Sequence, residues 1–368
     1  MNIFYDANKI YEAGTKAIKG ASFKYSSQLF EMNQLLETAL IQQSLREGTY
    51  KTSKGKHFVI NERGKIRNIS MNTMVDKTVF HLLCDEVLTP YISPKLIYDN
   101  SASQVNKGVD FHRKRLETHL HQFYRKYKNN DGYILLIDFS NYYGNIDHDL
   151  SYNQIKDLLK NINDEEKETA LKIIRSLYNS FDENIGIDIG CQPSQNVGIM
   201  YPIKIDNYIK IVKGCKYYGR YTDDSYIIHK DKEYLKQLLK EITEIANSLG
   251  IVINTKKTRI TKLSQPFKVL QIKYQLTETG RIIKRINSKA ITRERKKLKA
   301  YKRLLDKNKI KMNEIENIFK SWMSSNYKVM SKIQISNMYQ LYYDLFGRRV
   351  KWKNHSKLHW LMEHNLKT

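Results

Sequence analysis

The feature that most restricts the fold is an uninterrupted apolar run, YILLI at residues 133–137, which ends at an acidic side chain, Asp138. Five consecutive apolar residues fit a strand that is buried on both faces, because a half-buried strand would alternate apolar and polar side chains. The sequence therefore predicts a buried strand that carries a carboxylate at its end.

A second pair of strands is predicted at residues 216–221 and 225–229, with only Thr222, Asp223 and Asp224 between them. Adjacent carboxylates at a tight hairpin tip repel each other, and this repulsion costs stability unless a cation is bound. Mg²⁺ suits hard oxygen ligands of this kind, because it keeps several waters and also binds substrate phosphates. If the two predicted strands are neighbours, we expect Asp138 to lie across from Asp223. An Asp-Asp pair taken alone would fit an ordinary turn equally well.

The charge of the chain points to a polyanionic partner. Its 368 residues include 63 Lys and Arg against 38 Asp and Glu, a formal net charge of +25. The basic residues are spread along the whole length, which favours a nucleic-acid-binding protein over a single charged tail. The 26 tyrosines could stack on bases, although tyrosine also packs well in strands and helices.

Cysteine use and hydropathy bear on the compartment. Three widely spaced cysteines form neither a disulfide framework nor a zinc motif, as is typical of a reducing cytoplasm. No signal-peptide core and no run of about 18 apolar residues is present, so we expect a soluble cytoplasmic protein without a membrane partner.

Elements elsewhere follow from periodicity and turn residues. We expect helices around a strand pair at 57–60 and 65–70, then a helix over 75–88 that ends before Pro90. Helices are predicted around 149–160 and 165–178, and an amphipathic helix over 232–249 closes at Gly250. After Ser288 the chain is basic and helical. Its expected core anchors are Trp322, Tyr339, Tyr342 and Tyr343.

Four segments in order resemble the motifs of reverse transcriptases over residues 50 to 345. LLIDFSNYYGNIDH resembles the first catalytic motif, and YYGRYTDDSYII resembles the YxDD motif. IGCQPSQ resembles the loop between them, which in many members reads QGxxxSP. LGIVINTKKT resembles the segment that positions a lysine near the incoming triphosphate. One such match would be weak, but four in order are specific.

The resemblance implies an α+β right-hand polymerase. Its fingers would span residues 1–130, an antiparallel-sheet palm 131–285 and a basic helical thumb 286–368. Asp138, Asp223 and Asp224 would be catalytic and, with the backbone of Phe139, would hold two Mg²⁺ ions, for which Mn²⁺ could substitute. These ions would activate the primer 3′-hydroxyl and stabilise the departing pyrophosphate in RNA-directed DNA synthesis. The implied partners are template RNA, a DNA primer or product, and dNTPs.

Further positions carry over from the family one at a time. Lys65 and Arg67 lie on the strand pair that folds over the triphosphate, although an exposed basic hairpin would look the same. Tyr143 stands where an aromatic ring blocks the ribose 2′-hydroxyl, or it is a packed core aromatic. The remaining expected nucleotide contacts are Gln195 and Lys257. The expected nucleic-acid contacts are Lys107, Arg113, Arg115, Gly190 and Ser194, of which Ser194 could instead cap a helix.

Two positions depart from the family pattern. Gln271 stands in the strand pair near 267–274, which resembles the primer grip, where a glycine is usual. Pro202 falls inside an expected helix, which must kink or break there. His355, His359, Glu363 and His364 lie near helical spacing, but without a fourth ligand of clear spacing we predict a solvated basic helix and no metal site.

The subclass is less constrained than the family. We expect no RNase H domain after the helical tail, and the IGxxxSQ loop resembles that of the enzymes of diversity-generating retroelements. That likeness implies error-prone copying of a template RNA with a small basic accessory protein. Bacterial anti-phage defence reverse transcriptases share the core and are the alternative. An RNA-dependent RNA polymerase and a non-catalytic RNA-binding palm are the alternatives from other classes.

Overall fold

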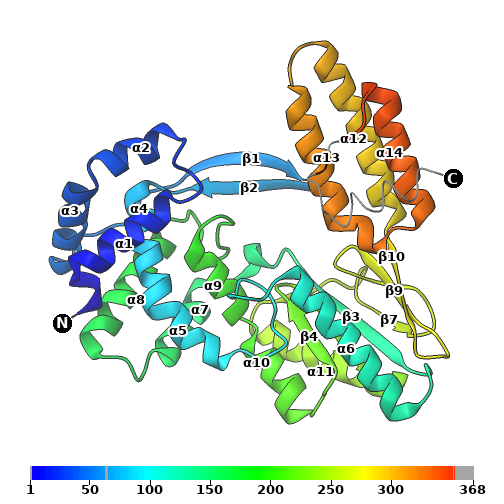
Figure 1. Ribbon diagram of the computed structural model, residues 1–368. Helices are drawn as coiled ribbons and strands as arrows, with labels where there is room; N and C mark the ends of the chain where they lie inside the picture. Colours follow the sequence, from blue (N-terminus) through cyan, green and yellow to red (C-terminus); the bar gives the residue numbers. More distant parts are fainter. Residues whose placement is uncertain (1, 63–64, 351, 353–368) are drawn as a thin grey trace. The chain divides into compact units, whose positions relative to one another are not determined.

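The structure is a computed structural model that describes residues 2–62, 65–350 and 352, with backbone alone at His57, residue 62 and residues 65–68 (Figure 1). The chain divides into two compact units. Unit 1 comprises Met1–His119 and Tyr133–Ile260, and unit 2 comprises Leu120–Gly132 and Thr261–Thr368. Helices mix with antiparallel sheets in the described chain, which confirms the expected α+β class. The division into fingers, palm and thumb stays a prediction.

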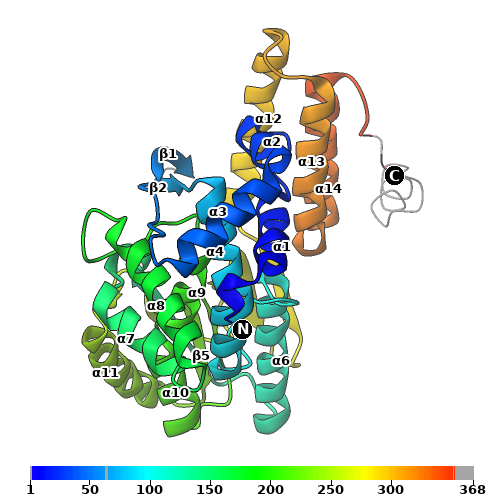
Figure 2. The same ribbon diagram turned by 90° about the vertical axis from the view of Figure 1, so that its left-hand side faces the viewer.

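Unit 1 begins with a group of short helices (Figures 1 and 2). These are α1 (Ala7–Ile18), α2 (Tyr25–Met32), α3 (Gln34–Arg46) and α4 (Met74–Leu83). Helix α1 starts at Asp6, whose carboxylate accepts from the backbone N–H groups of Asn8 and Lys9 and so satisfies two of the donors that a helix start leaves without partners. The predicted strand pair is present as β1 (Lys56–Glu62) and β2 (Lys65–Met71), paired in antiparallel register.

The helix expected to stop before Pro90 continues through it. A π-helical turn, Cys84–Leu88, follows α4 directly, and α5 (Thr89–Ile92) carries Pro90 in its first turn. Proline lacks an N–H and clashes with the preceding turn of a regular helix. The widened turn accommodates this, because the Thr89 N–H bonds the Cys84 carbonyl five residues back. The expectation of a helix end before Pro90 was therefore wrong.

The central sheet has the strand order β4-β5-β3-β6. Its strands are β3 (Tyr133–Ser140), β4 (Tyr218–Tyr221), β5 (Asp224–His229) and β6 (Val252–Ile253), and β7 (Arg259–Lys262) also pairs with β3. Ile134, Leu135 and Ile137 of β3 are at most 2% exposed, which confirms the predicted buried strand.

Helices cover the two faces of the hairpin formed by β4 and β5. On one face Tyr226 bonds His119 of α6 (Val109–Tyr127), with 3.0 Å between Tyr226 Oη and His119 Nδ1. On the other face Ile227 belongs to the same core as Leu235 and Leu238 of α11 (Lys232–Ser248). Helix α11 ends before Gly250, whose φ of +67° a glycine adopts without strain, as predicted.

Three further helices join the sheet to the N-terminal helices. They are α7 (His148–Leu158), α8 (Asp164–Asn179) and α9 (Gln192–Met200). Pro202 ends α9 and is the N-cap residue of a short helix, α10 (Ile203–Asn207), which a π-helical turn (Tyr208–Val212) extends. The expected helix break at Pro202 is confirmed, because the chain restarts a helix at the residue where proline is tolerated.

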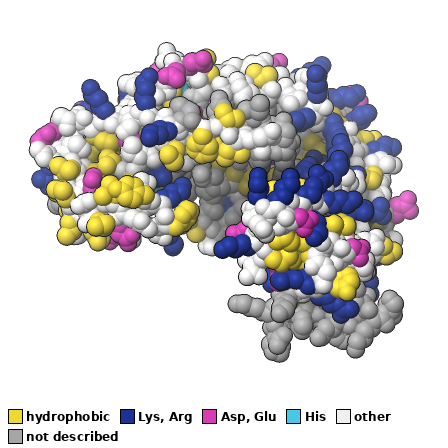
Figure 3. All heavy atoms as spheres, turned by 90° about the horizontal axis from the view of Figure 1, so that it is seen from above, with side chains coloured by type: hydrophobic (Ala, Val, Ile, Leu, Met, Phe, Trp, Pro, Cys, Tyr) yellow, Lys and Arg dark blue, Asp and Glu magenta, His cyan; other side chains and the backbone are white. Residues whose placement is uncertain are grey.

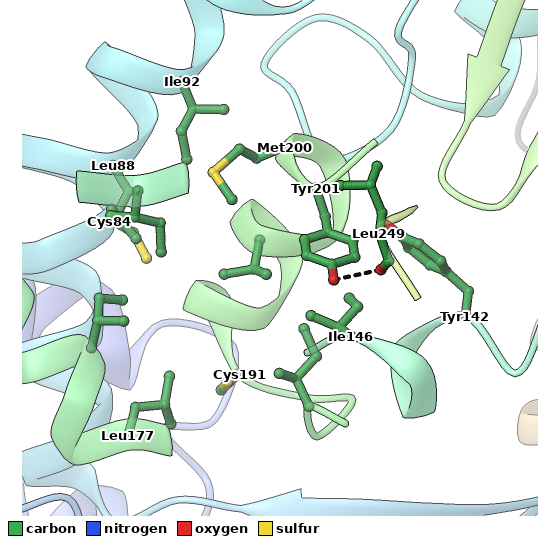
Figure 4. Close-up of a cluster of buried hydrophobic side chains, with 14 of the residues drawn as sticks. Cys84, Leu88, Ile92, Tyr142, Ile146, Leu177, Cys191, Met200, Tyr201 and Leu249 are labelled. Carbon is green, nitrogen blue, oxygen red and sulfur yellow. Dashed lines mark hydrogen bonds between the residues drawn. The ribbon is translucent and has the colours of Figure 1, made fainter. Parts of the chain in front are cut away.

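A single buried core ties these pieces together (Figure 4). Tyr201 points into its centre, and its hydroxyl donates to the Leu249 carbonyl at 2.7 Å. Tyr142, just past the end of β3, donates to the Gly198 carbonyl of α9 at 2.7 Å. The segment after Asp138 is therefore fixed both by apolar packing and by satisfied buried hydroxyls. Cys84, Cys191 and Cys215 are free and buried.

Unit 2 is built on a three-stranded antiparallel sheet and a helical bundle. The strands are β8 (Phe267–Val269), β9 (Ile272–Leu276) and β10 (Ile282–Ile286), and the helices are α12 (Ser288–Asp306), α13 (Met312–Asn326) and α14 (Lys332–Phe346). Gln271, between β8 and β9, has a φ of +72°, so it adopts the left-handed conformation for which glycine is usual.

The helices of unit 2 enclose their own core. Tyr339 and Tyr342 are buried in it and Trp322 packs against it, as predicted, but Tyr343 is 48% exposed and is not a core anchor. Figure 3 shows Lys and Arg side chains gathered in the part of the view where Figure 1 draws the unit 2 helices. The group around His355, His359, Glu363 and His364 lies outside the described residues. Over the described chain, no helix combines the length and apolar character needed to cross a membrane.

Candidate active site

The register of the sheet sets two of the predicted carboxylates opposite each other. Strands β3 and β5 pair antiparallel from Tyr133↔His229 to Asp138↔Asp224. The expectation that the two strands are neighbours is confirmed, but the partner of Asp138 is Asp224 and not Asp223. The tip folds one residue further along: the Phe139 N–H bonds the Asp223 carbonyl, with 3.3 Å between the atoms. All three aspartates are partly exposed at this end of the sheet.

The hairpin tip has an unusual backbone. Tyr221 pairs with Asp224, so Thr222 and Asp223 form a two-residue connection. Thr222 has a φ of +55°, which is strained for a β-branched residue. Its carbonyl accepts a 2.9 Å hydrogen bond from Nη1 of Arg220. Asp223 therefore lies in a turn, and Asp224 directly after it, that the Arg220 side chain holds by this hydrogen bond.

Lys257 bonds the carboxylate at the end of β3. Its Nζ lies 2.6 Å from Oδ1 and 2.8 Å from Oδ2 of Asp138, and this hydrogen bond raises the pKa of Lys257. The backbone around it is fixed to the same strand end. The Asn254 N–H donates to the Asp138 carbonyl at 2.8 Å, and Thr258 Oγ1 accepts from the Asp138 N–H at 3.3 Å.

The donor set suits a hard divalent cation. Lys257 shows that the Asp138 carboxylate accepts a cation through both oxygens, and Asp223 and Asp224 add further carboxylates at the same tip. Among the described residues, however, no three His, Cys, Asp or Glu side chains are gathered closely enough to hold a metal by themselves. Mg²⁺ fits such an arrangement, because it retains waters and takes phosphate oxygens from a substrate to complete its sphere.

A cavity of about 890 Å³ lies beside these residues within unit 1. Asp223 and Lys257 line it, and so does the segment 139–144 that follows Asp138. Asn254, whose N–H bonds the Asp138 carbonyl, and residues 181–183 and 185–189 complete the lining. No role was predicted for residues 181–183 and 185–188, and the only signal for them in the sequence is their position just before the IGCQPSQ loop.

Tyr143 lies in this lining, and its contact with a nucleotide stays a prediction. Burial, followed by the nearby Asp223 carboxylate, raises its pKa to about 12, so the hydroxyl is neutral at physiological pH. Its ring packs against Gly198 of α9 so closely that a Cβ at Gly198 would lie 2.8 Å from the Tyr143 hydroxyl. The Tyr143 side chain thus has a fixed backing on one side and faces the cavity on the other.

The family model described as "Reverse transcriptase (RNA-dependent DNA polymerase)" matches residues 52–274. The chain belongs to the reverse transcriptase family. The matched segment contains β3, the β4-β5 hairpin and Lys257, and therefore the whole of the site described above. None of the curated proteins matches the chain.

Solved structures of telomerase share the fold of this reverse transcriptase. Apo telomerase from Candida tropicalis, truncated from its C-terminal domain, is 15% identical, with a TM-score of 0.50 over 65% of this chain and 58% of that one. Telomerase from Candida albicans in complex with a fragment of telomeric RNA is 12% identical, with a TM-score of 0.50 over 86% and 62%. The chain thus spans about three-fifths of the length of these telomerases.

The IGCQPSQ loop of this reverse transcriptase separates into exposed and buried positions. Gln195 is exposed on α9, where it can contact a substrate. Ser194 is buried, and its Oγ lies 2.9 Å from Cys191 Sγ, so the hydroxyl belongs to the core and neither contacts nucleic acid nor caps α9. Gly190 has a φ of +134°, and a Cβ there would lie 3.1 Å from the Ser70 carbonyl, so this position requires glycine for the fold.

Two of the predicted template contacts, Arg115 and Lys107, already bond other residues of the chain. Arg115 bonds Asp99, a carboxylate that Lys210 also binds at 2.9 Å. Lys107 donates to the carbonyls of Tyr98 and Asn100 at 2.9 and 3.0 Å. A buried acid such as Asp99 needs cationic partners, so Arg115 has a structural role, and its contact with a phosphate stays a prediction.

The phosphate contacts expected of Arg113, Lys65 and Arg67 stay predictions too. Arg113 pairs with the exposed Asp110 at 3.4 Å, a weak contact that a phosphate could replace. Lys65 and Arg67 lie on β2, but their side chains are outside the described residues.

Proposed function

We propose that this reverse transcriptase copies RNA into DNA by adding dNTPs to a primer 3′ end at the site of Asp138, Asp223 and Asp224. The observation that carries the proposal is the register that sets Asp138 opposite Asp224 beside a large cavity. Three carboxylates at one edge of a sheet, in a chain of +25 net charge, fit metal-assisted chemistry on a polyanion.

Each residue has a distinct task in this proposal. Asp138, Asp223 and Asp224 would hold two Mg²⁺ ions, which when bound polarise phosphate oxygens and lower the pKa of the attacking hydroxyl. The Phe139 ring is 3% exposed, so this residue can offer only its backbone. Lys257, once released from Asp138, neutralises phosphate charge on the incoming nucleotide. Tyr143 fills the space that a ribose 2′-hydroxyl would occupy.

The subclass proposal rests on the IGCQPSQ loop. We infer an enzyme of a diversity-generating retroelement, which copies a template RNA with many errors and works with a small basic accessory protein. Sequencing the DNA that the enzyme makes on a template of balanced composition tests this inference. Substitutions concentrated opposite template adenines support it, and errors spread evenly over the four bases favour the defence-associated alternative.

Primer extension tests the main proposal. The wild-type chain with an RNA template, a DNA primer and Mg²⁺ is expected to incorporate dNTPs and to discriminate against NTPs. Asp223→Asn is expected to abolish synthesis while leaving RNA affinity unchanged. Extension with NTPs alone would instead identify an RNA-dependent RNA polymerase. RNA binding without any synthesis by the wild-type chain would identify a non-catalytic binding protein.

A further inference from the structure

Arg220 is a buried arginine placed two residues before the strained turn. It is 0% exposed, and its guanidinium grips the buried Asp206 carboxylate with two parallel bonds. Nε lies 2.8 Å from Oδ1 and Nη2 lies 2.7 Å from Oδ2. Tyr218 donates to the same carboxylate at 2.6 Å. Burial alone would lower the pKa of Arg220, but Asp206 holds it above its usual value, so the guanidinium stays charged.

The other donors of Arg220 reach backbone carbonyls around the hairpin. Nη1 donates to Thr222 at 2.9 Å and Nη2 donates to Ile199 of α9 at 2.8 Å. Its main chain bonds a second segment: Arg220 N–H donates to the Asp99 carbonyl at 3.1 Å and Ser101 N–H donates to the Arg220 carbonyl at 3.0 Å. One side chain thus joins the tip to the helix that carries Gln195.

A buried ion pair is a poor device for stability alone, because apolar residues of similar volume often stabilise a fold as well or better. The bond to Thr222 suggests another use. A threonine at φ +55° tends to return to an ordinary conformation, which would turn the following carboxylates away from Asp138. The hydrogen bond from Nη1 of Arg220 to the Thr222 carbonyl opposes this change of conformation.

We propose that Arg220 is a positioning residue that holds the Thr222 carbonyl and thereby keeps Asp223 and Asp224 in the geometry that binds cations. This inference rests on the proposed function of the aspartates. Because Arg220 is fully buried, it acts through the Thr222 carbonyl and not on the reacting groups themselves. Lysine at this position keeps the charge opposite Asp206 but lacks the planar fork that reaches Asp206 and Thr222 together.

The test compares Arg220→Lys with the double variant Arg220→Lys/Thr222→Asn. Asparagine tolerates the left-handed conformation better than threonine, so it should hold the turn without the arginine. In Arg220→Lys, amide hydrogen exchange of the segment 221–226 is expected to increase at least tenfold, while exchange in α11 and thermal melting change little. Mn²⁺ binding is expected to weaken, and kcat is expected to fall with little change in KM for dNTPs. Thr222→Asn is expected to restore much of each loss.

This test can fail or succeed independently of the test of DNA synthesis. Unchanged exchange at 221–226 in a folded Arg220→Lys variant overturns the positioning role, whether or not the wild type makes DNA. Losses that Thr222→Asn fails to restore also overturn it, because they indicate a general structural defect. A wild-type chain that makes no DNA contradicts the proposed function alone, since hydrogen exchange still reports on the turn.

A different observation concerns the surface of α2 and α3. Seven large apolar side chains are exposed within residues 23–40, several of them by more than three-quarters. On α2, Tyr25, Leu29 and Met32 recur at helical spacing and form one stripe. The others are Phe23, Leu35, Leu36 and Leu40. Figure 3 shows hydrophobic side chains gathered at the left, where Figure 1 places the N-terminal helices.

The charge of this face does not suit nucleic acid. Residues 23–40 contain one lysine and two glutamates, in a chain whose net charge is +25. A face that binds phosphates needs cations, whereas an exposed apolar patch of this size marks a contact with protein. Seven side chains exposed to this degree present on the order of 700 Å², close to the roughly 800 Å² that each partner contributes to a standard interface.

We propose that a second copy of this chain covers this apolar face in a two-fold symmetric dimer. A two-fold contact matches a patch with itself, so an apolar stripe meets an equivalent stripe. The flanking charges fit this arrangement. Lys24 is the N-cap residue of α2 and Glu31 lies in its last turn, so antiparallel packing of two α2 helices brings each Lys24 near Glu31 of the other copy.

Light scattering after size-exclusion chromatography tests the proposal, with nuclease-treated protein in enough salt to screen the net charge. The wild-type chain is expected at about twice its mass of 43.6 kDa, and Leu36→Glu is expected at the monomer mass. Ile333→Glu, at a side chain 72% exposed on α14, is the matched control and should stay dimeric. A monomeric wild type, or a dimer that survives Leu36→Glu, overturns the proposal.

Discussion

Lys257 and Asp138 form a two-pronged ion pair, with the lysine Nζ 2.6 and 2.8 Å from the two carboxylate oxygens. The pair joins β3 to the loop after β6, and the lysine side chain is 51% exposed. The Lys257 ammonium therefore binds the same carboxylate oxygens that a metal ion would need. A metal ion can displace it, because an exposed ion pair contributes little free energy.

Lys257→Met is expected to strengthen cation binding and weaken catalysis. Without the competing ammonium, Mn²⁺ affinity in the absence of nucleotide should rise a few-fold, since exposed ion pairs contribute about 1 kcal/mol or less. The KM for dNTPs should rise by roughly tenfold with the loss of one phosphate contact. A Mn²⁺ titration followed by electron paramagnetic resonance measures the first effect and primer extension the second. Lys256→Met is the control, and a Mn²⁺ affinity equal to that of the wild type would show that the pair does not compete.

Tyr143→Ala is expected to reduce discrimination between dNTPs and NTPs. Gly198 backs the tyrosine ring, so the ring cannot move away from a 2′-hydroxyl in that direction. Removing the ring should lower the ratio of kcat/KM values by roughly 10- to 100-fold, a range typical of a steric difference in a pocket. Tyr143→Phe keeps the ring and should keep the ratio. Equal discrimination by the alanine and wild-type enzymes would make Tyr143 a packing residue only.

Arg220→Met and Asp206→Leu, each of which removes one charge of the buried pair, are expected to destabilise the fold more singly than in combination. Each single change leaves a charge buried without its partner, which typically costs about 3–5 kcal/mol. Arg220→Met/Asp206→Leu removes both charges and should recover much of that loss. Urea unfolding of the two singles and the double gives the coupling free energy. Additive losses would mean that the two side chains do not depend on each other.

Stability is expected to fall between pH 6.5 and about 4 because of two buried histidines. Burial lowers the pKa of both His112 and His119 to about 4. In this window the unfolded chain binds protons that the folded chain does not, so acid favours unfolding, and the stability present above pH 6.5 is lost as the pH falls. The effect is on the order of 3 kcal/mol for each histidine.

Chemical unfolding at a series of pH values measures this dependence. His119→Gln should flatten it, because glutamine does not titrate, whereas the same change at the exposed His121 should not. Asp99, Arg115 and Lys210 surround His119, and the two cations oppose its protonation. A His119→Gln variant with the wild-type pH slope would rule out this histidine as the cause.

Local sequence patterns determined much of the site. The apolar run before Asp138, the spacing of the two strands around Asp223-Asp224 and the amphipathic helix after them each express a short-range preference. Their pairing could be expected, but its exact register could not, because a shift of one residue changes no local pattern. The local patterns therefore could not show that Asp224, and not Asp223, lies opposite Asp138.

The sequence did not show which charged side chains bond residues far away in the chain. Arg115 and Lys107 look like free cations in a basic stretch, yet Arg115 serves the buried Asp99 and Lys107 bonds two backbone carbonyls. No role was predicted for Arg220, because the sequence does not show that Arg220 and Asp206 form a buried ion pair. The continuation through Pro90 depended on a π-helical turn that no propensity predicts.

Primer extension by Asp224→Asn is the most direct test of whether Asp138, Asp223 and Asp224 bind the catalytic cations. Asp182→Asn is the control, because Asp182 lines the same cavity but lies on another segment. For Asp224→Asn we expect dNTP incorporation to fall by at least about 10³-fold with RNA affinity unchanged, since a metal-bound carboxylate contributes several kcal/mol to the transition state. Asp182→Asn should retain near wild-type synthesis. Synthesis by Asp224→Asn at the wild-type rate would show that these aspartates are not the catalytic site.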